Sequence, residues 1–375
     1  MSCERRFWTR GRQTRKSSFI RREFDSRAPA EFLGNSNPRF DGETNPTTCP
    51  YPRRLIVGLV GIALLLAILL RLRILPRPEN QKSGKFPEQL VYVRSADDLV
   101  DTGVLFTSPR QPSKPLAIIW VHGWGANFYT PSYVGIGRAL AERGFPTISV
   151  NTRMHDIRNV EKYTLLGKRV RGGGYWGVTS EDARDIAAWI DYAEQLGYSR
   201  VILVGHSAGW ASVARYQADS QDHRVAGLVF ASPGVGYSAE SDDAQLLAQA
   251  RKLVDEGAGD DLLRLPHRSF PSFVSASTYL DTVNTPREYK DFFGTKGPDA
   301  AVTRITCPVL AFFGSKDDIR GEKDLALLTS SVRRLPRGPA TVDTAMIANG
   351  NHEYVGEEAQ VSEKIVHWIE AELPK

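Results

Sequence analysis

The sequence predicts an α/β protein built on an eight-stranded, mostly parallel sheet flanked by helices. Three observations carry this prediction. Short apolar runs typical of buried strands recur between residues 90 and 347, and amphipathic helical patterns fall between most of them. The first two strand-like runs have no helix between them, which predicts an antiparallel edge to the sheet.

The individual elements follow from these runs. The predicted strands are 90–93, 103–108, 116–121, 146–150, 200–204, 226–231, 308–313 and 341–347. The predicted helices are 131–143, 179–196, 209–219, 322–334 and 357–372. In the second helix, Ile186, Ile190 and Ala193 recur three or four residues apart, which places them on one buried face. Thr179 or Ser180 is expected to cap the first turn of that helix.

Two long segments interrupt the alternation within a predicted domain that spans residues 90–375. Segment 236–300 predicts a helical lid insertion. Its aromatic side chains suit either a cover over an apolar acyl pocket or packing of the lid onto the core, and they are Phe270, Phe273, Tyr279, Phe292 and Phe293. Segment 151–178 is basic and favours a solvated loop over an anion-binding surface, with Arg153, His155, Arg158, Lys168, Arg169 and Arg171.

The N-terminal part has a different composition. Residues 1–85 hold 17 Lys and Arg against 7 Asp and Glu, whereas the remaining residues hold 31 against 36. Residues 1–54 are rich in Arg, Ser, Asn, Pro and Gly without an apolar period, which predicts a disordered basic arm. Because no domain interleaves its basic residues with base-stacking aromatics, we expect no nucleic acid partner.

An uncharged apolar run of 16 residues, Leu55–Leu70, follows the arm. Extended to residue 75, it predicts a single transmembrane helix over 55–75, joined to the domain by a proline-containing linker over 76–89. A cleaved signal peptide is the rival interpretation, but no small-residue cleavage site follows and the leader would be long. The basic arm favours a cytosolic N-terminus and a domain on the non-cytosolic side. Near the span, however, the basic residues on its C-terminal side (Arg71, Arg73, Arg77, Lys82 and Lys85) outnumber those on its N-terminal side (Arg39, Arg53 and Arg54), which opposes this orientation.

The run Gly205-His-Ser207-Ala-Gly209 joins a predicted strand to a predicted helix. A serine on such a sharp turn is presented at the end of a sheet, and the flanking glycines avoid clashes with the neighbouring strand and helix. Ser207 is therefore the predicted nucleophile. The alternative is a glycine-rich turn with an incidental serine. A serine hydroxyl needs a base, a group that orients the base and donors for an oxyanion, so the partners decide between the two.

The acid and the base are predicted just past two later strands. Asp317 follows strand 308–313 and is the predicted acid, with Asp318 as an alternative, because carboxyl ends of parallel strands form sites in α/β sheets. His352 is the one histidine that lies both in a post-strand loop and after the acid. It is the predicted base.

The predicted oxyanion donors are the backbone N–H groups of Trp124 and Ala208. Trp124 lies in the run His122-Gly-Trp-Gly125 after strand 116–121, and Ala208 follows the nucleophile. His122 is expected to brace that loop. The three cysteines, at positions 3, 49 and 307, form no cluster with histidines at metal-ligand spacing, so we expect no metal site.

The order Ser207, Asp317, His352 resembles the α/β-hydrolase superfamily. The segments around His122-Gly-Trp-Gly, Asn151-Thr-Arg-Met-His-Asp156 and the serine turn are similar to its serine esterase and lipase-like branch. The resemblance covers residues 90–375; the basic arm and the span are not part of that fold. It implies hydrolysis of a small-molecule or lipid-like ester, or of a thioester or amide, through an acyl-enzyme without metal or cofactor. A membrane-anchored acyltransferase with the same triad and a non-catalytic binding protein on this fold stay open as alternatives.

Overall fold

The computed structural model describes residues 87–108, 115–157, 160–163, 169–235, 243–266 and 271–373. The predicted basic arm (1–54), the predicted transmembrane helix (55–75) and residues 76–86 of the predicted linker (76–89) lie outside these ranges. Among the helices within them, none is both long and apolar enough to cross a membrane.

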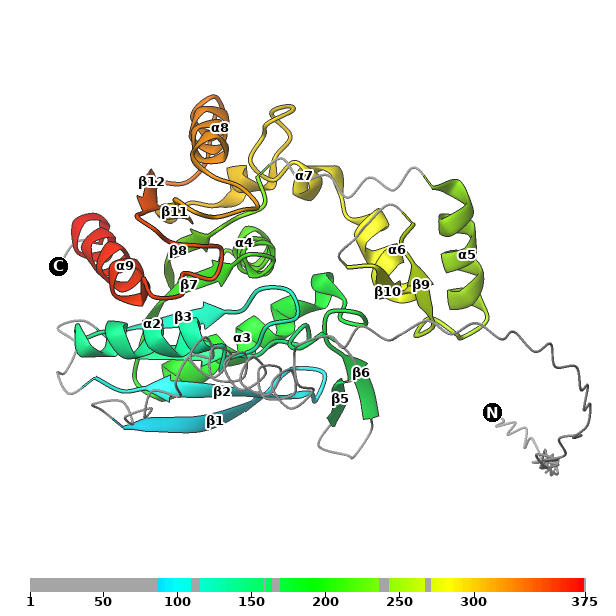
Figure 1. Ribbon diagram of the computed structural model, residues 1–375, viewed down its shortest axis with the longest axis horizontal. Coiled ribbons are helices and arrows are strands. Elements are labelled where there is room, and N and C mark those ends of the chain that lie inside the picture. Colours follow the sequence, from blue (N-terminus) through cyan, green and yellow to red (C-terminus); the bar gives the residue numbers. More distant parts are fainter. Residues whose placement is uncertain are drawn as a thin grey trace, which may run out of the picture. The chain divides into compact units, whose positions relative to one another are not determined.

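Eight strands form the central sheet (Figure 1). They are β1 (Glu88–Arg94), β2 (Val100–Phe106), β3 (Leu116–Val121), β4 (Thr147–Val150), β7 (Arg200–His206), β8 (Val225–Ala231), β11 (Val309–Gly314) and β12 (Val342–Ile347). Their spatial order is β1-β2-β4-β3-β7-β8-β11-β12. The pairs β1–β2 and β2–β4 are antiparallel, and all the other neighbouring pairs of this sheet are parallel. The predicted α/β class, the eight strands and the antiparallel edge are confirmed.

Helices cover both faces of this sheet (Figure 1). One face carries α2 (Pro131–Glu142) and α9 (Glu358–Glu372), and the other carries α3 (Asp182–Gln195), α4 (Gly209–Ser220) and α8 (Glu322–Arg333). Strand side chains alternate between these two layers. In β3, Ile118 and Trp120 pack with α2 and α9, while Ile119 and Val121 pack on the opposite side. A strand buried on both faces reads as a continuous apolar run, which is why the sequence located these strands.

The start of α3 differs from the prediction. Residues Thr179–Glu181 form a 3₁₀ turn, η1, and α3 begins at Asp182 without a side-chain cap. Thr179 and Ser180 lie inside that turn, so neither hydroxyl caps the helix. The N–H of Ser180 instead donates to the Asp281 carboxylate at 3.2 Å. The predicted cap is therefore wrong, and a contact from a distant segment takes its place.

The segment between β8 and β11 contains α5 (Ala244–Asp255), β9 (Leu262–Arg264), β10 (Phe273–Ser275), α6 (Ala276–Asn284), α7 (Arg287–Lys290) and η2 (Ala301–Arg304). α5, α6 and the hairpin β9–β10 share a small core of their own that includes Leu246, Val274 and Tyr279. Phe292 and Phe293 instead pack in the main core. For these two aromatics, packing on the core is the role that the structure shows.

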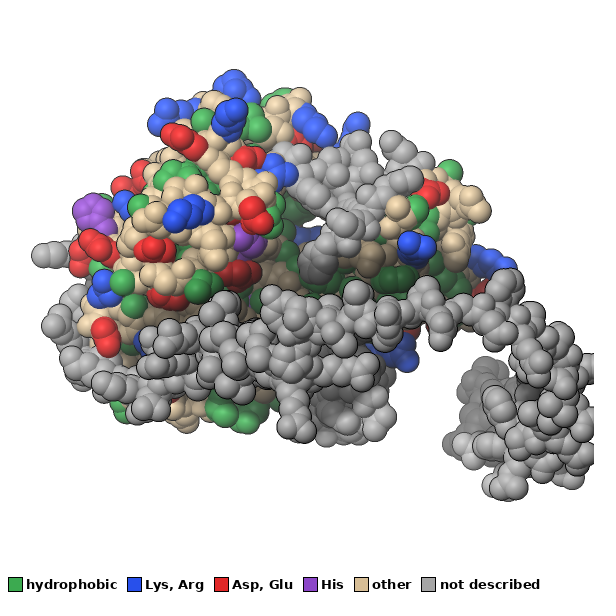
Figure 2. Space-filling view, in the orientation of Figure 1, with side chains coloured by type: hydrophobic (Ala, Val, Ile, Leu, Met, Phe, Trp, Pro, Cys, Tyr) green, Lys and Arg blue, Asp and Glu red, His purple; other side chains and the backbone are tan. Residues whose placement is uncertain are grey.

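A second short hairpin, β5 (Val160–Tyr163) and β6 (Arg169–Gly172), follows β4. The segment just beyond it contacts the insertion: Tyr175 O accepts from Ser275 N at 2.7 Å, and the Trp176 indole donates to Asp260 O at 2.8 Å. On the face shown in Figure 2, acidic and basic side chains of the described residues are interspersed, an arrangement that keeps the local electrostatic potential small.

Candidate active site

Ser207 occupies the turn between β7 and α4 with a φ of 48°. This left-handed backbone is uncommon for a residue with a side chain, and a 2.8 Å bond from Ser207 N to Ala231 O anchors it. The flanking glycines have a steric cause. A Cβ on Gly205 would lie 2.4 Å from Gly209 O, and one on Gly209 would lie 2.3 Å from His122 O. The clashes expected at both glycines are confirmed.

The structure brings Ser207, His352 and Asp317 together in one row. His352 Nε2 lies 3.0 Å from Ser207 Oγ, and His352 Nδ1 lies 3.0 Å from Asp317 Oδ2. Since a carboxylate only accepts, Nδ1 carries the proton and Nε2 is free to accept from the serine hydroxyl. The Asp317 side chain is fully buried, whereas Asp318 is exposed on the same loop. Asp317 is thus the carboxylate placed against the imidazole.

The surroundings of this row shift both ionisation equilibria. Burial opposes a charged His352, but the hydrogen bond and the negative charge of Asp317 outweigh it and raise the pKa of His352. Burial would likewise raise the pKa of Asp317, but hydrogen bonds from His352, from Ser232 and from the Ile319 N–H lower it overall. Asp317 therefore stays ionised at neutral pH and stabilises positive charge on the imidazole.

Ser232, at the end of β8, was not foreseen in the sequence. Its hydroxyl donates to Asp317 Oδ2 at 2.7 Å and accepts from Tyr354 OH at 2.6 Å. Ser232 has a φ of 54°, and its N–H donates to Phe312 O in the neighbouring strand β11. Nothing in its local sequence distinguishes this serine, because its partners lie 85 and 122 residues further along the chain.

The two predicted oxyanion donors belong to residues in the loop beside Ser207 and directly after it. A Cβ on Gly123 would lie 3.0 Å from Ser207 Cβ, so the loop that carries Trp124 lies against the nucleophile. The Trp124 indole donates to Gly174 O at 3.0 Å, which ties its side chain to the segment after β6. Within the described part of the chain, the Ala208 N–H finds no hydrogen-bond acceptor. An unpaired N–H after the nucleophile suits an oxyanion donor.

A buried relay links the loop after β3 to the loop of His352. Gly123 N donates to Tyr133 OH at 3.2 Å, and Tyr133 OH lies 2.6 Å from His206 Nδ1. His206 Nε2 lies 2.8 Å from His352 O, and a carbonyl only accepts, so Nε2 carries the proton and Tyr133 donates to Nδ1. Burial, with the nearby His352, lowers the pKa of His206 to about 3. His206 therefore remains neutral, and sequence reasoning missed its role.

His122 braces its loop as expected. Its Nδ1 lies 2.7 Å from Gly123 O, and its Nε2 accepts from Thr152 N at 3.2 Å. The first bond holds the imidazole within the loop after β3, and the second ties that loop to the loop after β4.

Arg153 corrects the solvated-loop interpretation of segment 151–178. Its side chain is 5% exposed and pairs with Asp185 at 2.8 Å, Glu181 at 2.7 Å and Asp97 at 3.0 Å. The guanidinium is thus buried in ion pairs that join neighbouring segments, and an anionic substrate cannot reach it. Of the other basic residues in the segment, His155 pairs with Asp156 and Arg171 lies over Trp176, while the side chains of Arg158, Lys168 and Arg169 lie outside the described residues.

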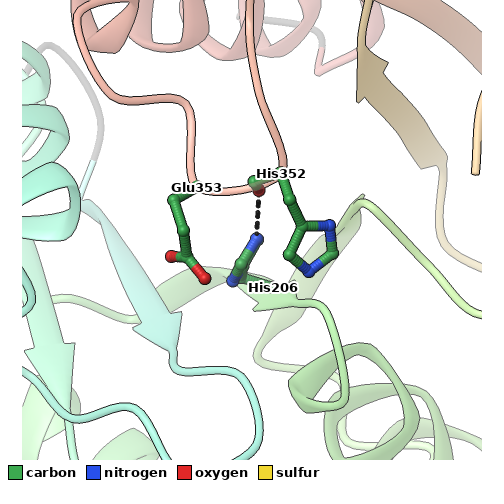
Figure 3. A group of neighbouring side chains, drawn as sticks. All are labelled: His206, His352 and Glu353. Carbon is green, nitrogen blue, oxygen red and sulfur yellow. Dashed lines mark hydrogen bonds between the residues drawn. The ribbon is translucent and has the colours of Figure 1, made fainter. Parts of the chain in front are cut away.

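His206, His352 and Glu353 form the one group in the described ranges that brings three possible metal ligands together (Figure 3). One ligand atom of each lies within 4.8 Å of the others. All four ring nitrogens, however, already take part in the hydrogen bonds given above. A metal ion here would have to displace Ser207, Asp317, Tyr133 or the His352 carbonyl, so the hydrogen-bonded network is the better account of this group.

Fold and site together define an α/β protein with a serine on a strand–turn–helix junction and a histidine–carboxylate pair aligned with its hydroxyl. The family model of the alpha/beta hydrolase family matches residues 118–363. This chain belongs to that family. No curated protein matches it significantly.

Solved structures share the fold at low sequence identity. Est1E from Butyrivibrio proteoclasticus, bound to ferulic acid, is 19% identical with a TM-score of 0.52, over 76% of this chain and 100% of that one. DcsB in complex with a substrate analogue is 15% identical with a TM-score of 0.56, over 76% and 100%. An esterase of Pyrococcus furiosus is 13% identical with a TM-score of 0.52, over 80% and 97%.

Proposed function

We propose that this protein is a serine hydrolase that cleaves carboxylic esters through an acyl-enzyme. The observation that carries the proposal is the row from Ser207 Oγ through both nitrogens of His352 to Asp317, with both contacts at 3.0 Å. Thioesters and amides react by the same steps and are secondary candidates. The esterase from Pyrococcus furiosus and the ferulic acid bound to Est1E favour an ester.

In the first half of the reaction, His352 Nε2 takes the proton from Ser207 as Oγ attacks the substrate carbonyl. Asp317 holds the imidazole in the tautomer that leaves Nε2 open and stabilises the imidazolium that forms. The N–H groups of Ala208 and Trp124 receive the negative oxygen of the tetrahedral intermediate. The protonated His352 then gives its proton to the leaving alkoxide, and Ser207 is left acylated.

In the second half, His352 takes a proton from water, which attacks the acyl carbonyl. The second tetrahedral intermediate collapses, the proton returns to Ser207 Oγ, and the carboxylic acid leaves. The chemistry requires no group beyond these side chains and water.

The test combines p-nitrophenyl esters of increasing chain length with labelling by a fluorophosphonate. The full chain should hydrolyse at least one ester and be labelled on Ser207, and Ser207→Ala should lose both properties while its thermal unfolding is unchanged. Ser330→Ala, at an exposed position on α8, is the matched control and should behave as the unmodified protein. Undiminished hydrolysis by Ser207→Ala would refute the proposal, and an unlabelled Ser207 would favour the binding-protein alternative.

We also propose that residues 55–75 anchor this hydrolase in a membrane with the catalytic domain on the non-cytosolic side. The support is the uncharged run Leu55–Leu70 and the basic arm before it. Alkaline carbonate should leave the full chain in the membrane fraction, and protease added outside sealed cells should digest the domain. Release by carbonate, or protection of the domain, would contradict the anchor or its orientation respectively.

A further inference from the structure

Glu353 directly follows His352 in the loop after β12, and the catalytic steps above do not use it. Its carboxylate lies beside the His206 ring, and His352 lies on the other side of that ring (Figure 3). One of its oxygens and one ring nitrogen each of His206 and His352 lie within 4.8 Å of one another. A carboxylate is therefore placed at the centre of the site, close to the base.

The Oε2 atom of Glu353 is buried and has no hydrogen-bond partner among the described residues. Its neighbours explain this. His206 uses its only N–H on the His352 carbonyl, and Tyr133 uses its hydroxyl proton on His206. An enclosed carboxylate oxygen without a donor costs free energy, and such groups persist where they serve another purpose. The site without substrate thus contains a buried carboxylate oxygen that accepts no hydrogen bond from the described residues, and this oxygen lies close to the base.

Ionisable groups from three other elements and from its own loop face Glu353. They are Tyr133 from α2, His206 from β7, Asp317 from the loop after β11, and His352 and Tyr354 from its own loop. Burial raises the pKa of Glu353, His352 lowers it and the charge of Asp317 raises it again, so that the pKa lies above its ordinary value overall. Since His206 stays neutral, His352 is the group in this set that becomes positive during the proposed reaction.

We propose that Glu353 is a second carboxyl group that supports His352, stabilising the imidazolium that forms when Ser207 gives up its proton. It is a positioning residue that acts through His352, and the inference rests on the proposed function. Asp317 accepts a hydrogen bond from His352 Nδ1. Glu353 lies on the other side of the His206 ring and acts on His352 through its negative charge alone. The imidazolium then lies in the field of two carboxylates, one bonded and one held at a distance.

The test is the pH profile of kcat/KM for Glu353→Gln, which keeps the shape of the side chain and removes its charge. The negative charge of Glu353, so close to His352, favours the imidazolium. Its removal should therefore move the acid limb of the profile down by about one pH unit and lower the plateau of kcat/KM about tenfold. Glu353→Asp keeps a carboxylate and should leave the acid limb near its original position. An unshifted limb in Glu353→Gln, or an equal shift in Glu353→Asp, would overturn the inference.

Asp318→Asn is the matched control, because it removes one carboxylate from an exposed position near the same histidine. Solvent screens this charge, so the acid limb should move by less than about 0.3 pH units. A shift as large as that of Glu353→Gln would show that any nearby charge suffices and would refute a specific role for Glu353. Labelling of Ser207 by a fluorophosphonate in every variant separates these outcomes from failure of the proposed function, which would abolish labelling in the unmodified protein.

Discussion

Ser232 Oγ donates to Asp317 Oδ2 at 2.7 Å, and that same oxygen accepts from His352 Nδ1 at 3.0 Å. Ser232, just after β8, therefore holds the same oxygen of Asp317 that orients His352, the base in the loop after β12. The hydroxyl of Ser232 fixes where the negative charge lies relative to the imidazole.

Ser232→Ala should lower kcat/KM about tenfold, because one charge-assisted hydrogen bond to the carboxylate is worth about 1.5–3 kcal/mol and water replaces part of it. The pKa of Asp317 should rise toward its ordinary value, since Ser232 contributes to its lowering. Steady-state kinetics on the best p-nitrophenyl ester measure the first effect. Full activity in Ser232→Ala would show that the hydroxyl does not matter to the carboxylate.

Asp317→Asn should reduce kcat about 10³- to 10⁴-fold, because the amide leaves His352 in the wrong tautomer. Asp318→Asn should retain kcat within about threefold, since that side chain is exposed and screened. Kinetics of the two variants side by side decide which aspartate is the acid. The reverse ranking would assign the role to Asp318.

His206 should make the fold sensitive to acid. Its pKa is about 3 in the folded chain against 6.5 for the free side chain, so between these values only the unfolded chain binds the proton. The free energy of unfolding should fall as the pH drops through this window, by about 1.4 kcal/mol per pH unit from this group. His206→Gln should show a shallower dependence in urea unfolding between pH 6.5 and 4. Parallel curves for the two proteins would count against a neutral buried His206.

Arg153→Met should lower the free energy of unfolding by about 3–5 kcal/mol, because it leaves Asp185 buried without its cation. Arg184→Met is the matched control. Arg184 pairs with Asp97 and Glu181 of the same network, but its side chain is 46% exposed. Its loss should cost less than about 1 kcal/mol. Equal losses in urea unfolding would mean that burial of Arg153 adds nothing to its pairs.

The sheet could be predicted from the sequence because its inner strands, such as β3, β4, β8 and β11, are buried on both faces. Runs such as Leu116–Val121 contain no polar residue, and their alternation with helices gives both the class and the antiparallel edge. The two short hairpins could not be predicted. β9 and β10 have three residues each, too few for a period to show, and their partners are fixed by the small core around them.

The same contrast holds at the site. Ser207, Asp317 and His352 could be placed because each follows a recognisable strand, and the sheet brings strand ends together. Ser232 and Glu353 carry no such mark. Arg153 was misread because arginine is usually exposed, while its burial depends on Asp185, 32 residues away, and Asp97, 56 residues away. Sequence patterns predict which face of a helix or strand is buried. They do not show which residue, distant in the sequence, pairs with a given charged side chain.

The relay from Gly123 through Tyr133 and His206 to the His352 carbonyl has a mechanical consequence. It joins the loop beside the nucleophile, helix α2, strand β7 and the loop of the base by three hydrogen bonds, two of them buried and the third partly buried. Movement of any one of these parts against the others would break at least one of those bonds. The catalytic groups are therefore preorganised: their spacing is set when the chain folds, and an arriving ester meets a geometry that needs no further assembly.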